Sequence, residues 1–170
     1  MHITEEQMQE LRLGALTAID GLWFMAVEEK YGFDTALELD LEVWKNYGRV
    51  LLKRISRMLG LAMDPEEPID LATVNLLMET VCHVDGTQCG GEVGDGEIVF
   101  RVHRCSWWDN LSRSGRESHV PCEFVDNTIF RDWLEYVDPT LSFEITHSLP
   151  RGDDHCEWVI GRRITEQGRE

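Results

Sequence analysis

Apolar residues recur every three or four positions through the first sixty residues, and no other sequence feature constrains the fold as strongly. This spacing places apolar side chains along one face of an amphipathic helix. Residues 31–33 separate two such stripes, so we expect two long helices that form an antiparallel hairpin, with both stripes in the core. The stripes are Met8, Leu11, Ala15, Ile19, Leu22 and Ala26, then Leu37, Leu41, Trp44, Tyr47, Leu51, Ile55 and Met58.

The ends of these helices carry typical capping residues. Thr4 is followed three residues later by Gln7, a capping-box spacing that satisfies free backbone N–H groups at a helix start. Gly32 and Gly60 stand where the helices should end, because glycine readily adopts the left-handed conformation. Asp34 is the expected N-cap of the second helix.

The second half of the chain changes from helical to strand periodicity. A third helix is expected after a cap at Asp70, and beyond Thr80 β-branched residues and a glycine cluster predict a strand and a flexible hairpin. Alternation of apolar and polar residues then predicts strands at 97–103, 141–149 and 156–160. One face of the second of these strands is expected to carry Leu141, Phe143, Ile145, His147 and Leu149.

Helical segments interrupt these strands. A short one covers 107–113 and ends at Gly115, and a longer one carries Trp133, with its start left open between Pro121 and Asp126. Helices segregated from an antiparallel sheet define an α+β fold. We therefore expect an N-terminal helical hairpin and a third helix packed against an antiparallel sheet, with one inserted helix.

The length of 170 residues fits one domain of ordinary size. Within it, we expect residues 1–62 to form the helical hairpin and residues 63–164 to form the α+β portion that carries the site. A turn at 64–68 should join the two portions, and the end of the chain should fray from residue 165.

Composition narrows the class of function. Thirty-two acidic and sixteen basic residues give a net charge of −16, which opposes binding to nucleic acid or to an anionic membrane, because both need clustered basic residues. The first residues lack a secretory signal, and no apolar stretch approaches the ~20 residues of a membrane span. Five cysteines without an export signal favour reduced thiols and a cytoplasmic location.

Three cysteines stand at the ends of predicted elements. Cys105 closes a strand, Cys122 lies at a helix start, and Cys156 begins a strand. Side chains at element ends often converge on a shared pocket, so these thiols are candidate site residues. A helix start lowers the pKa of a thiol, which makes Cys122 the candidate nucleophile and His119 its candidate base. The alternative is that each thiol is a small core residue, as free cysteines often are.

The same residues also suggest a metal site. Three thiolates with a neighbouring imidazole would bind zinc or iron, although the spacing lacks the paired pattern typical of structural zinc sites. The candidate metal ligands are Cys105, Cys122, Cys156 and His155. The carboxylates that flank the apolar stripes are further candidate bases if they turn inward, and these are Glu28, Glu29 and Glu42.

A composite motif runs from residue 105 to residue 158: a Cys-x-Trp opening, a downstream glycine, a second cysteine with an acidic residue after it, and a final Gly-Asp-x-x-Cys. This motif resembles that of the L-2-amino-thiazoline-4-carboxylate hydrolase-like proteins. Its ending is also similar to that of 4-vinyl-reductase-type ligand-binding domains, in which helices pack against an antiparallel sheet. The chain departs at Ser106, where proline often follows the first cysteine. The matching positions are Cys105, Trp107 or Trp108, Gly115, Cys122, Asp126, Gly152, Asp153 and Cys156.

The resemblance implies a hydrolase that cleaves a C–N bond of a small heterocyclic or amide substrate, using a cysteine thiolate or a Cys/His-bound metal. The alternative is a binding or sensing domain of the 4-vinyl-reductase type, which holds a small molecule or a metal without turnover. A third hypothesis makes the cysteines core residues of a partner-binding protein. The first two predict a small-molecule partner, and the sequence allows a homo-oligomer.

Overall fold

A computed structural model describes residues 2–61 and 67–163 of the chain. The described elements are α1 (Glu5–Tyr31), α2 (Phe33–Leu59), α3 (Leu71–Val84), β1 (Gln88–Val93), β2 (Glu97–Arg104), α4 (Ser106–Ser114), α5 (Cys122–Val137), β3 (Leu141–His147), η1 (Leu149–Arg151) and β4 (Cys156–Arg162). Most of the predicted turn at 64–68 and the predicted frayed end from 165 lie outside the described residues. Within them, no helix is both long and apolar enough to cross a membrane.

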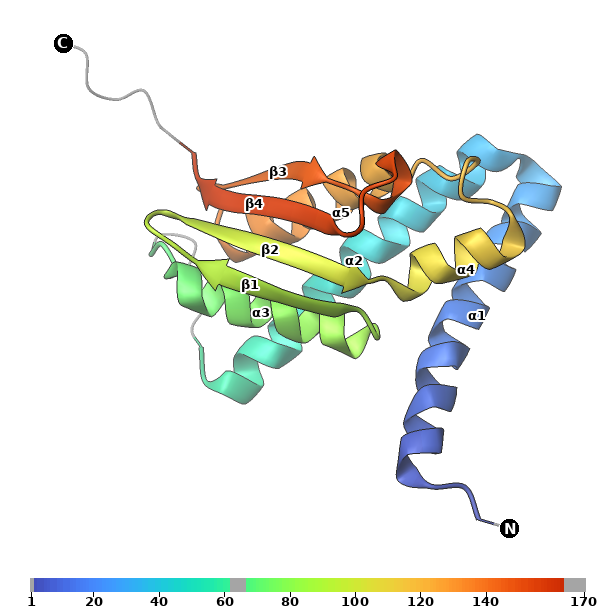
Figure 1. Ribbon diagram of the computed structural model, residues 1–170, viewed down its shortest axis with the longest axis horizontal. Coiled ribbons are helices and arrows are strands. Elements are labelled where there is room, and N and C mark those ends of the chain that lie inside the picture. Colours follow the sequence, from blue (N-terminus) through green and yellow to red (C-terminus); the bar gives the residue numbers. More distant parts are fainter. Residues whose placement is uncertain (1, 62–66, 164–170) are drawn as a thin grey trace.

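The strands form one antiparallel sheet in the order β1-β2-β4-β3. Helices α3 and α5 pack on one face of this sheet, α2 packs against both of them, and none of the described helices covers the opposite face (Figure 1). This arrangement confirms the expected α+β class. The predicted helical hairpin is also present, since α1 and α2 pack side by side and only Gly32 separates them.

The core lies between the sheet and its covering helices. Alternate residues of the two central strands point inward and are buried, as the period of two predicts. Phe100 of β2 stacks on Trp158 of β4 at a ring-centroid distance of 5.4 Å, and Phe130 of α5 lies 4.2 Å from the same tryptophan. Burial of such large side chains stabilises the fold by roughly 1.5–3 kcal/mol each.

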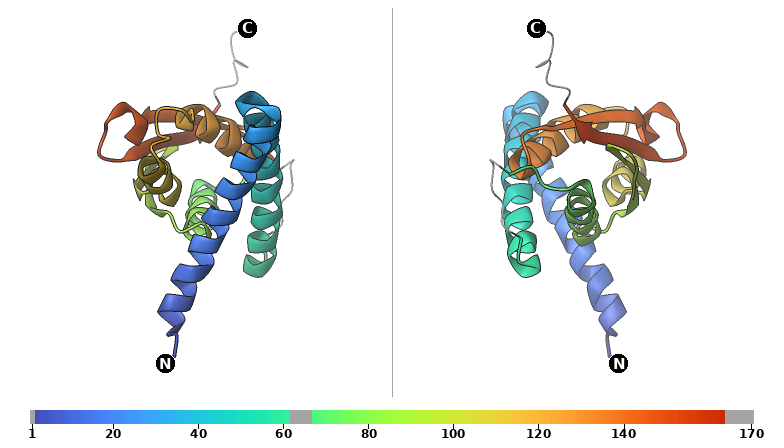
Figure 2. Two further views of the ribbon diagram at one scale, coloured as in Figure 1. Left: turned by 90° about the vertical axis from the view of Figure 1, so that its right-hand side faces the viewer. Right: turned by 90° about the vertical axis from the view of Figure 1, so that its left-hand side faces the viewer.

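Helix α1 does not carry its predicted stripe into the core. Its capping box at Thr4 and Gln7 forms as expected, but no residue of the helix is buried. Leu11, Ile19 and Leu22 are 57%, 65% and 61% exposed. The reason is geometric: α1 packs mainly against α2, with a smaller contact to α4, and its N-terminal half extends beyond the rest of the molecule (Figures 1 and 2).

Three predictions at helix ends were wrong. Met58, expected in the second stripe, is 86% exposed because it lies on the last turn of α2. Asp34 does not cap that helix; the N-cap is Gly32, whose φ of 88° is easily adopted by glycine. Helix α3 continues past Thr80 to Val84, since Val81 and Cys82 complete its buried face.

Strand β3 contains an irregularity that the sequence did not indicate. The register shifts between Ile145 and His147, so that His147 pairs with Glu157 of β4. The shift moves the imidazole out of the apolar face on which strict alternation had placed it, and its side chain is 50% exposed. The predicted grouping of His147 with Leu141 and Phe143 was therefore wrong.

Candidate ligand-binding cavity

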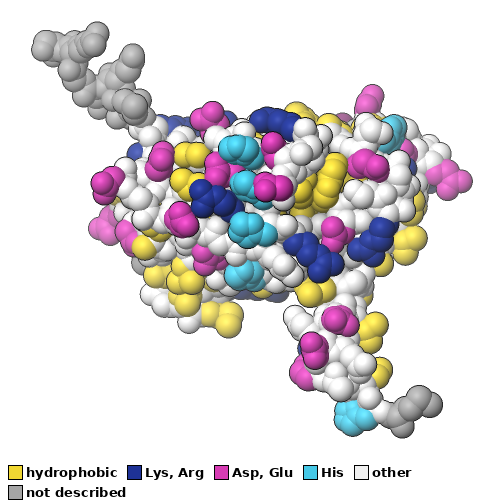
Figure 3. All heavy atoms as spheres, viewed as in Figure 1, with side chains coloured by type: hydrophobic (Ala, Val, Ile, Leu, Met, Phe, Trp, Pro, Cys, Tyr) yellow, Lys and Arg dark blue, Asp and Glu magenta, His cyan; other side chains and the backbone are white. Residues whose placement is uncertain are grey.

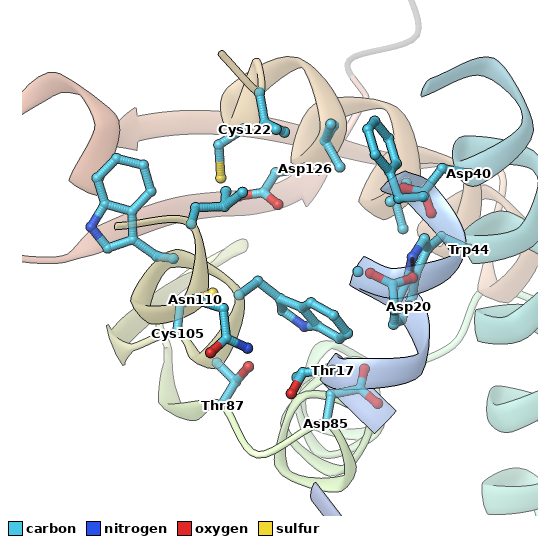
Figure 4. Close-up of a pocket in the computed structure, with 18 of the residues that line it drawn as sticks. Thr17, Asp20, Asp40, Trp44, Asp85, Thr87, Cys105, Asn110, Cys122 and Asp126 are labelled. Carbon is cyan, nitrogen blue, oxygen red and sulfur yellow. Dashed lines mark hydrogen bonds between the residues drawn. The ribbon is translucent and has the colours of Figure 1, made fainter. Parts of the chain in front are cut away.

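A cavity of about 710 Å³ lies between helices α1, α2, α4 and α5 and the inner face of the sheet. Figure 4 shows side chains from each of these helices pointing into it. Its volume falls within the roughly 300–1,000 Å³ range of small-molecule sites. The wall is mainly apolar, and its large side chains include Phe24, Trp44, Trp107, Phe130, Trp133 and Trp158.

Helix α1 presents several small residues to the cavity. Gly14, Thr17, Ala18 and Gly21 follow one another at helical spacing, and all four line the cavity. A Cβ atom added at Gly14 or Gly21 would meet no atom within 4 Å. Large side chains at these positions would fill the space between α1 and the body of the molecule, so the small residues keep it open.

Two carboxyl groups line the helical side of the cavity next to an indole. Trp44 of α2 donates from Nε1 to Asp20 of α1 at 2.9 Å. Burial, followed by the nearby charge of Asp20, raises the pKa of Asp40 to about 7, and burial also raises the pKa of Asp20. Among the described residues, Asp40 Oδ1 is buried without a hydrogen-bond partner. This end of the cavity thus contains a buried acceptor that no described group satisfies.

The sheet side of the cavity contains a buried donor that no described group satisfies. Trp158 lines the cavity, and its Nε1 is buried with no partner in the described part of the chain. Asp126 of α5 is also in this wall, where burial, followed by the charge of Glu123, raises its pKa to about 7. A buried polar atom that lacks a protein partner costs roughly 1–3 kcal/mol, so a bound molecule that satisfies one is stabilised.

A further carboxyl group lies at the α3 side of the cavity. Burial raises the pKa of Asp85 to about 6, although Tyr47 donates a hydrogen bond of 2.5 Å to it. Thr17, Thr87 and Asn110 add neutral polar groups nearby (Figure 4). The cavity is therefore apolar overall, with separate polar groups and several carboxyls on different walls.

The structure places Cys105, Cys122 and Cys156 around this cavity. Cys105 precedes α4, Cys122 begins α5, and Cys156 begins β4, where its Sγ accepts a hydrogen bond of 3.4 Å from the backbone N–H of Leu149. Cys82, which the sequence analysis left out of the site, also lines the cavity. The thiols thus share one apolar environment.

That environment opposes the thiolate state. Burial, followed by the charge of Asp126, raises the pKa of Cys105 to about 12 and that of Cys122 still higher. Burial likewise raises the pKa of Cys156 to about 11. The expected lowering of the Cys122 pKa by the helix start was therefore wrong, since desolvation of the thiolate outweighs the helix dipole here.

The two histidines of the predicted site do not accompany the thiols. His119 does not line the cavity; it packs against Phe33, with ring centroids 4.4 Å apart, and lies 3.4 Å from a carboxylate oxygen of Glu28. His155 lies with His147, at the edge of the uncovered face of the sheet. His119 was predicted to be the base for a thiol, and His155 was predicted to share a metal ion with the thiols. Neither histidine lines the cavity with them.

The predicted metal set does not assemble as a group. Among residues 2–61 and 67–163, one set of three or more His, Cys, Asp or Glu side chains has all its candidate ligand atoms within 4.8 Å of one another. That set is His147, His155 and Glu157, and it contains no cysteine. The structure therefore separates His155 from the three thiols.

The carboxylates singled out from sequence are not those of the cavity. Glu28 pairs with Arg116 at 2.7 Å, while Glu29 and Glu42 are exposed. Asp126 also lines the cavity, and the sequence analysis had named it only as a motif position and a possible helix start. The carboxyl groups of the cavity that the sequence analysis missed are Asp20, Asp40 and Asp85. A usable signal existed for the first two, because each adjoins an apolar residue of a helical stripe.

Fold and cavity together define an α+β protein with a largely apolar cavity. The chain belongs to the family described as a family of unknown function (DUF6125), whose model matches residues 6–161. No curated protein matches the sequence significantly. The fold is similar to a crystal structure of trafficking protein particle complex subunit 3 from Naegleria fowleri covalently bound to palmitic acid. The TM-score is 0.56, with 15% identity over 95% of this chain and 99% of that chain.

Proposed function

We propose that this protein is a binding module for a neutral amphiphilic small molecule with a large hydrocarbon portion. The observation that carries the proposal is the largely apolar cavity of about 710 Å³. A ligand that fills it removes apolar surface from water, which contributes about 25 cal/mol per Å². This proposal corresponds to the binding-domain alternative predicted from the sequence. The apolar wall of the cavity narrows the ligand class to molecules with a large hydrocarbon portion.

The polar atoms of the wall specify the ligand further. Asp40 Oδ1 accepts and Trp158 Nε1 donates, and neither atom has a hydrogen-bond partner within the described residues. A hydroxyl group, which can donate and accept, complements both kinds of atom. An anionic head group is disfavoured above pH 7, because Asp40 and Asp126 are then ionised and would repel it.

The similar structure supports the hydrocarbon part of this proposal. That protein, subunit 3 of the trafficking protein particle complex, is covalently bound to palmitic acid, a long hydrocarbon chain. In the present chain the cavity thiols have raised pKa values, so they are protonated and uncharged near neutral pH. We therefore propose non-covalent binding.

The experiment is a titration with the neutral fluorescent probe N-phenyl-1-naphthylamine at pH 8. Its fluorescence should rise saturably with a single site per chain, and the anionic probe 8-anilino-1-naphthalenesulfonate should bind more weakly. Lowering the pH to 5.5 should reduce this difference, because protonation of Asp40 and Asp126 removes their charge.

Two positions on α1 provide a matched pair of variants. Both Ala15 and Ala18 are exposed, but only Ala18 lines the cavity. Ala18→Leu therefore adds a large side chain to the cavity wall, while Ala15→Leu makes the same change outside it. We expect Ala18→Leu, and independently Gly21→Leu, to weaken probe binding by more than about tenfold, equivalent to about 1.4 kcal/mol. Equal binding by Ala18→Leu, Gly21→Leu and Ala15→Leu would exclude the cavity as the binding site.

The C–N hydrolase hypothesis stays a prediction. The raised thiol pKa values do not favour a cysteine nucleophile, and His119 is not placed to act as its base.

The cytoplasmic location also stays a prediction, supported by the five free cysteines. The homo-oligomer is supported by the exposed apolar side chains of α1, and the molar mass measured by sedimentation tests it.

A further inference from the structure

A row of histidines crosses the uncovered face of the sheet, away from the cavity (Figure 3). The rings of His147 and His155 stack with centroids 5.5 Å apart, and the ring centroid of His103 lies 6.2 Å from that of His155. Glu157 of β4 lies beside the first two. We propose that His147, His155 and Glu157 form a binding site for a divalent transition-metal ion, with Zn²⁺ as the expected occupant.

The fold assembles this group from two neighbouring strands. The register shift in β3 turns His147 outward and sets it opposite Glu157, and His155 stands two residues before Glu157, where β4 begins. As a result, Nδ1 of His147 lies 3.3 Å from Oε1 of Glu157, and Nε2 of His155 lies 3.9 Å from Oε2. One candidate ligand atom from each of the three side chains lies within 4.8 Å of the others.

His155 presents a free lone pair to this group. Its Nδ1 contacts the carboxylate of Asp154, which can only accept a hydrogen bond, so the ring proton resides on Nδ1. This leaves Nε2 as the basic nitrogen. That atom is buried and has no hydrogen-bond partner in the described part of the chain. Histidine ligands in metal sites are typically oriented by such a carboxylate on the other ring nitrogen.

Glu157 is oriented in the same manner. The hydroxyl of Thr146 donates to its Oε1 at 2.9 Å, and its side chain is only 15% exposed. Two imidazoles and one carboxylate are a ligand set that binds Zn²⁺ and leaves the fourth position of a tetrahedron for water or another ligand. His147, which is 50% exposed, keeps that position accessible from solvent.

Arg101 competes with a metal for Glu157. Its Nε donates to Oε2 at 2.8 Å, and its Nη1 lies 3.4 Å from Glu92. A bound cation would share Glu157 with the guanidinium group and would be repelled by it. Removing the positive charge by Arg101→Gln should therefore strengthen metal binding, an effect that a merely structural role for the histidines does not predict.

The test is a competition titration of the chelator-treated full chain with ZnCl₂ against a chromophoric zinc indicator. We expect one Zn²⁺ per chain and a loss of more than about tenfold in affinity for His147→Ala and for His155→Ala. His103→Ala, in the same row but outside the three-residue group, is the matched control and should bind normally. Circular dichroism checks that each variant keeps its fold.

Two results would overturn the site. One is the absence of saturable zinc binding by the unmodified chain. The other is binding that survives His147→Ala and is lost in Cys122→Ser, which would assign the metal to the cavity thiols. The neutral probe of the cavity should bind the histidine variants as it binds the unmodified chain, so failure of the metal site and failure of the proposed function remain distinguishable.

Discussion

At the scale of single residues, the buried carboxyl groups of the cavity are the strongest indication of a ligand-binding site. Asp40 is 8% exposed, yet it lies beside Asp20, and no cationic side chain of residues 2–61 or 67–163 pairs with it. A fold that only needed stability would place an apolar residue or a paired charge there. A buried carboxyl group in a cavity wall is typical of a site where a polar group contacts a ligand.

Asp40→Asn should stabilise the protein in a pH-dependent manner. The folded-state pKa of about 7 lies above the ordinary value of 3.8 for this group. Between these two pH values the folded chain still holds a proton on Asp40 that the unfolded chain has released. Stability is therefore lost as pH rises through this window. We expect the advantage of Asn over Asp, measured by urea denaturation, to grow by on the order of 1–3 kcal/mol from pH 4 to pH 8.

Glu38→Gln provides the control, because Glu38 is exposed on the same helix. Its effect on the unfolding free energy should stay within about 0.5 kcal/mol across the same pH range. An advantage of Asp40→Asn that does not change with pH would show that Asp40 does not titrate in this window.

The cysteines show what residue patterns could and could not indicate. Their positions at element ends predicted that Cys105, Cys122 and Cys156 would face a common space, and all three line the cavity. Their chemistry was not predictable in this way, because the pKa of a thiol depends on desolvation by residues distant in sequence. The same limit applies to His119 and His155, whose proximity in sequence to the cysteines did not bring them into the cavity.

At the scale of elements, the sequence predicted where the helices and strands lie better than it predicted which face of each element turns inward. The pattern located α2, α5 and the strands because each buries its apolar face. For α1 the pattern located the helix but not its inner face. The small residues that turn toward the body leave a cavity, and an empty space has no hydrophobic signature in a sequence.

Gly48 illustrates how two elements approach each other. A Cβ atom at this position of α2 would lie 1.9 Å from Cε2 of Trp133 in α5. The indole Nε1 of Trp133 donates to the backbone oxygen of Trp44 at 3.1 Å, which fixes the ring in this place. Glycine is required here by contact rather than by backbone conformation.

Gly48→Ala should therefore destabilise the protein, although alanine is the better helix former. The clash with Trp133 should cost about 1–3 kcal/mol and outweigh the ~1 kcal/mol that alanine gains over glycine in a helix. Gly14→Ala is the matched control: its added Cβ meets nothing within 4 Å, so it should stabilise by about 0.5–1 kcal/mol. Denaturant unfolding measures both, and a stabilising Gly48→Ala would contradict the close packing of α2 and α5.

At the scale of the whole molecule, α1 is a wall of the cavity more than a part of the core. The described part of this helix buries no residue. It is attached to the body by few polar contacts, of which the hydrogen bond between Trp44 and Asp20 and the ion pair between Glu28 and Arg116 are the main ones. Both lie in its C-terminal half, so the N-terminal half is held weakly.

The weak attachment of α1 to the body of the molecule predicts how its hydrogen exchange should respond to a ligand. Segments with little buried apolar surface open locally at a lower free energy than the global unfolding of the core. In the ligand-free protein we expect the amides of α1 to exchange faster than those of α3, which buries Val74, Leu77 and Met78 completely. A ligand in the cavity bridges α1 to the sheet and should slow exchange in α1, most strongly around Thr17 and Gly21.

Exchange measured by mass spectrometry with and without N-phenyl-1-naphthylamine tests this coupling between cavity and helix. Saturating probe should protect α1 and leave α3 unchanged, since α3 is already held by the core. In Ala18→Leu the added side chain occupies the cavity, so its α1 should lose the response to the probe. A response of α1 that persists in Ala18→Leu would mean that the probe acts at a surface outside the cavity.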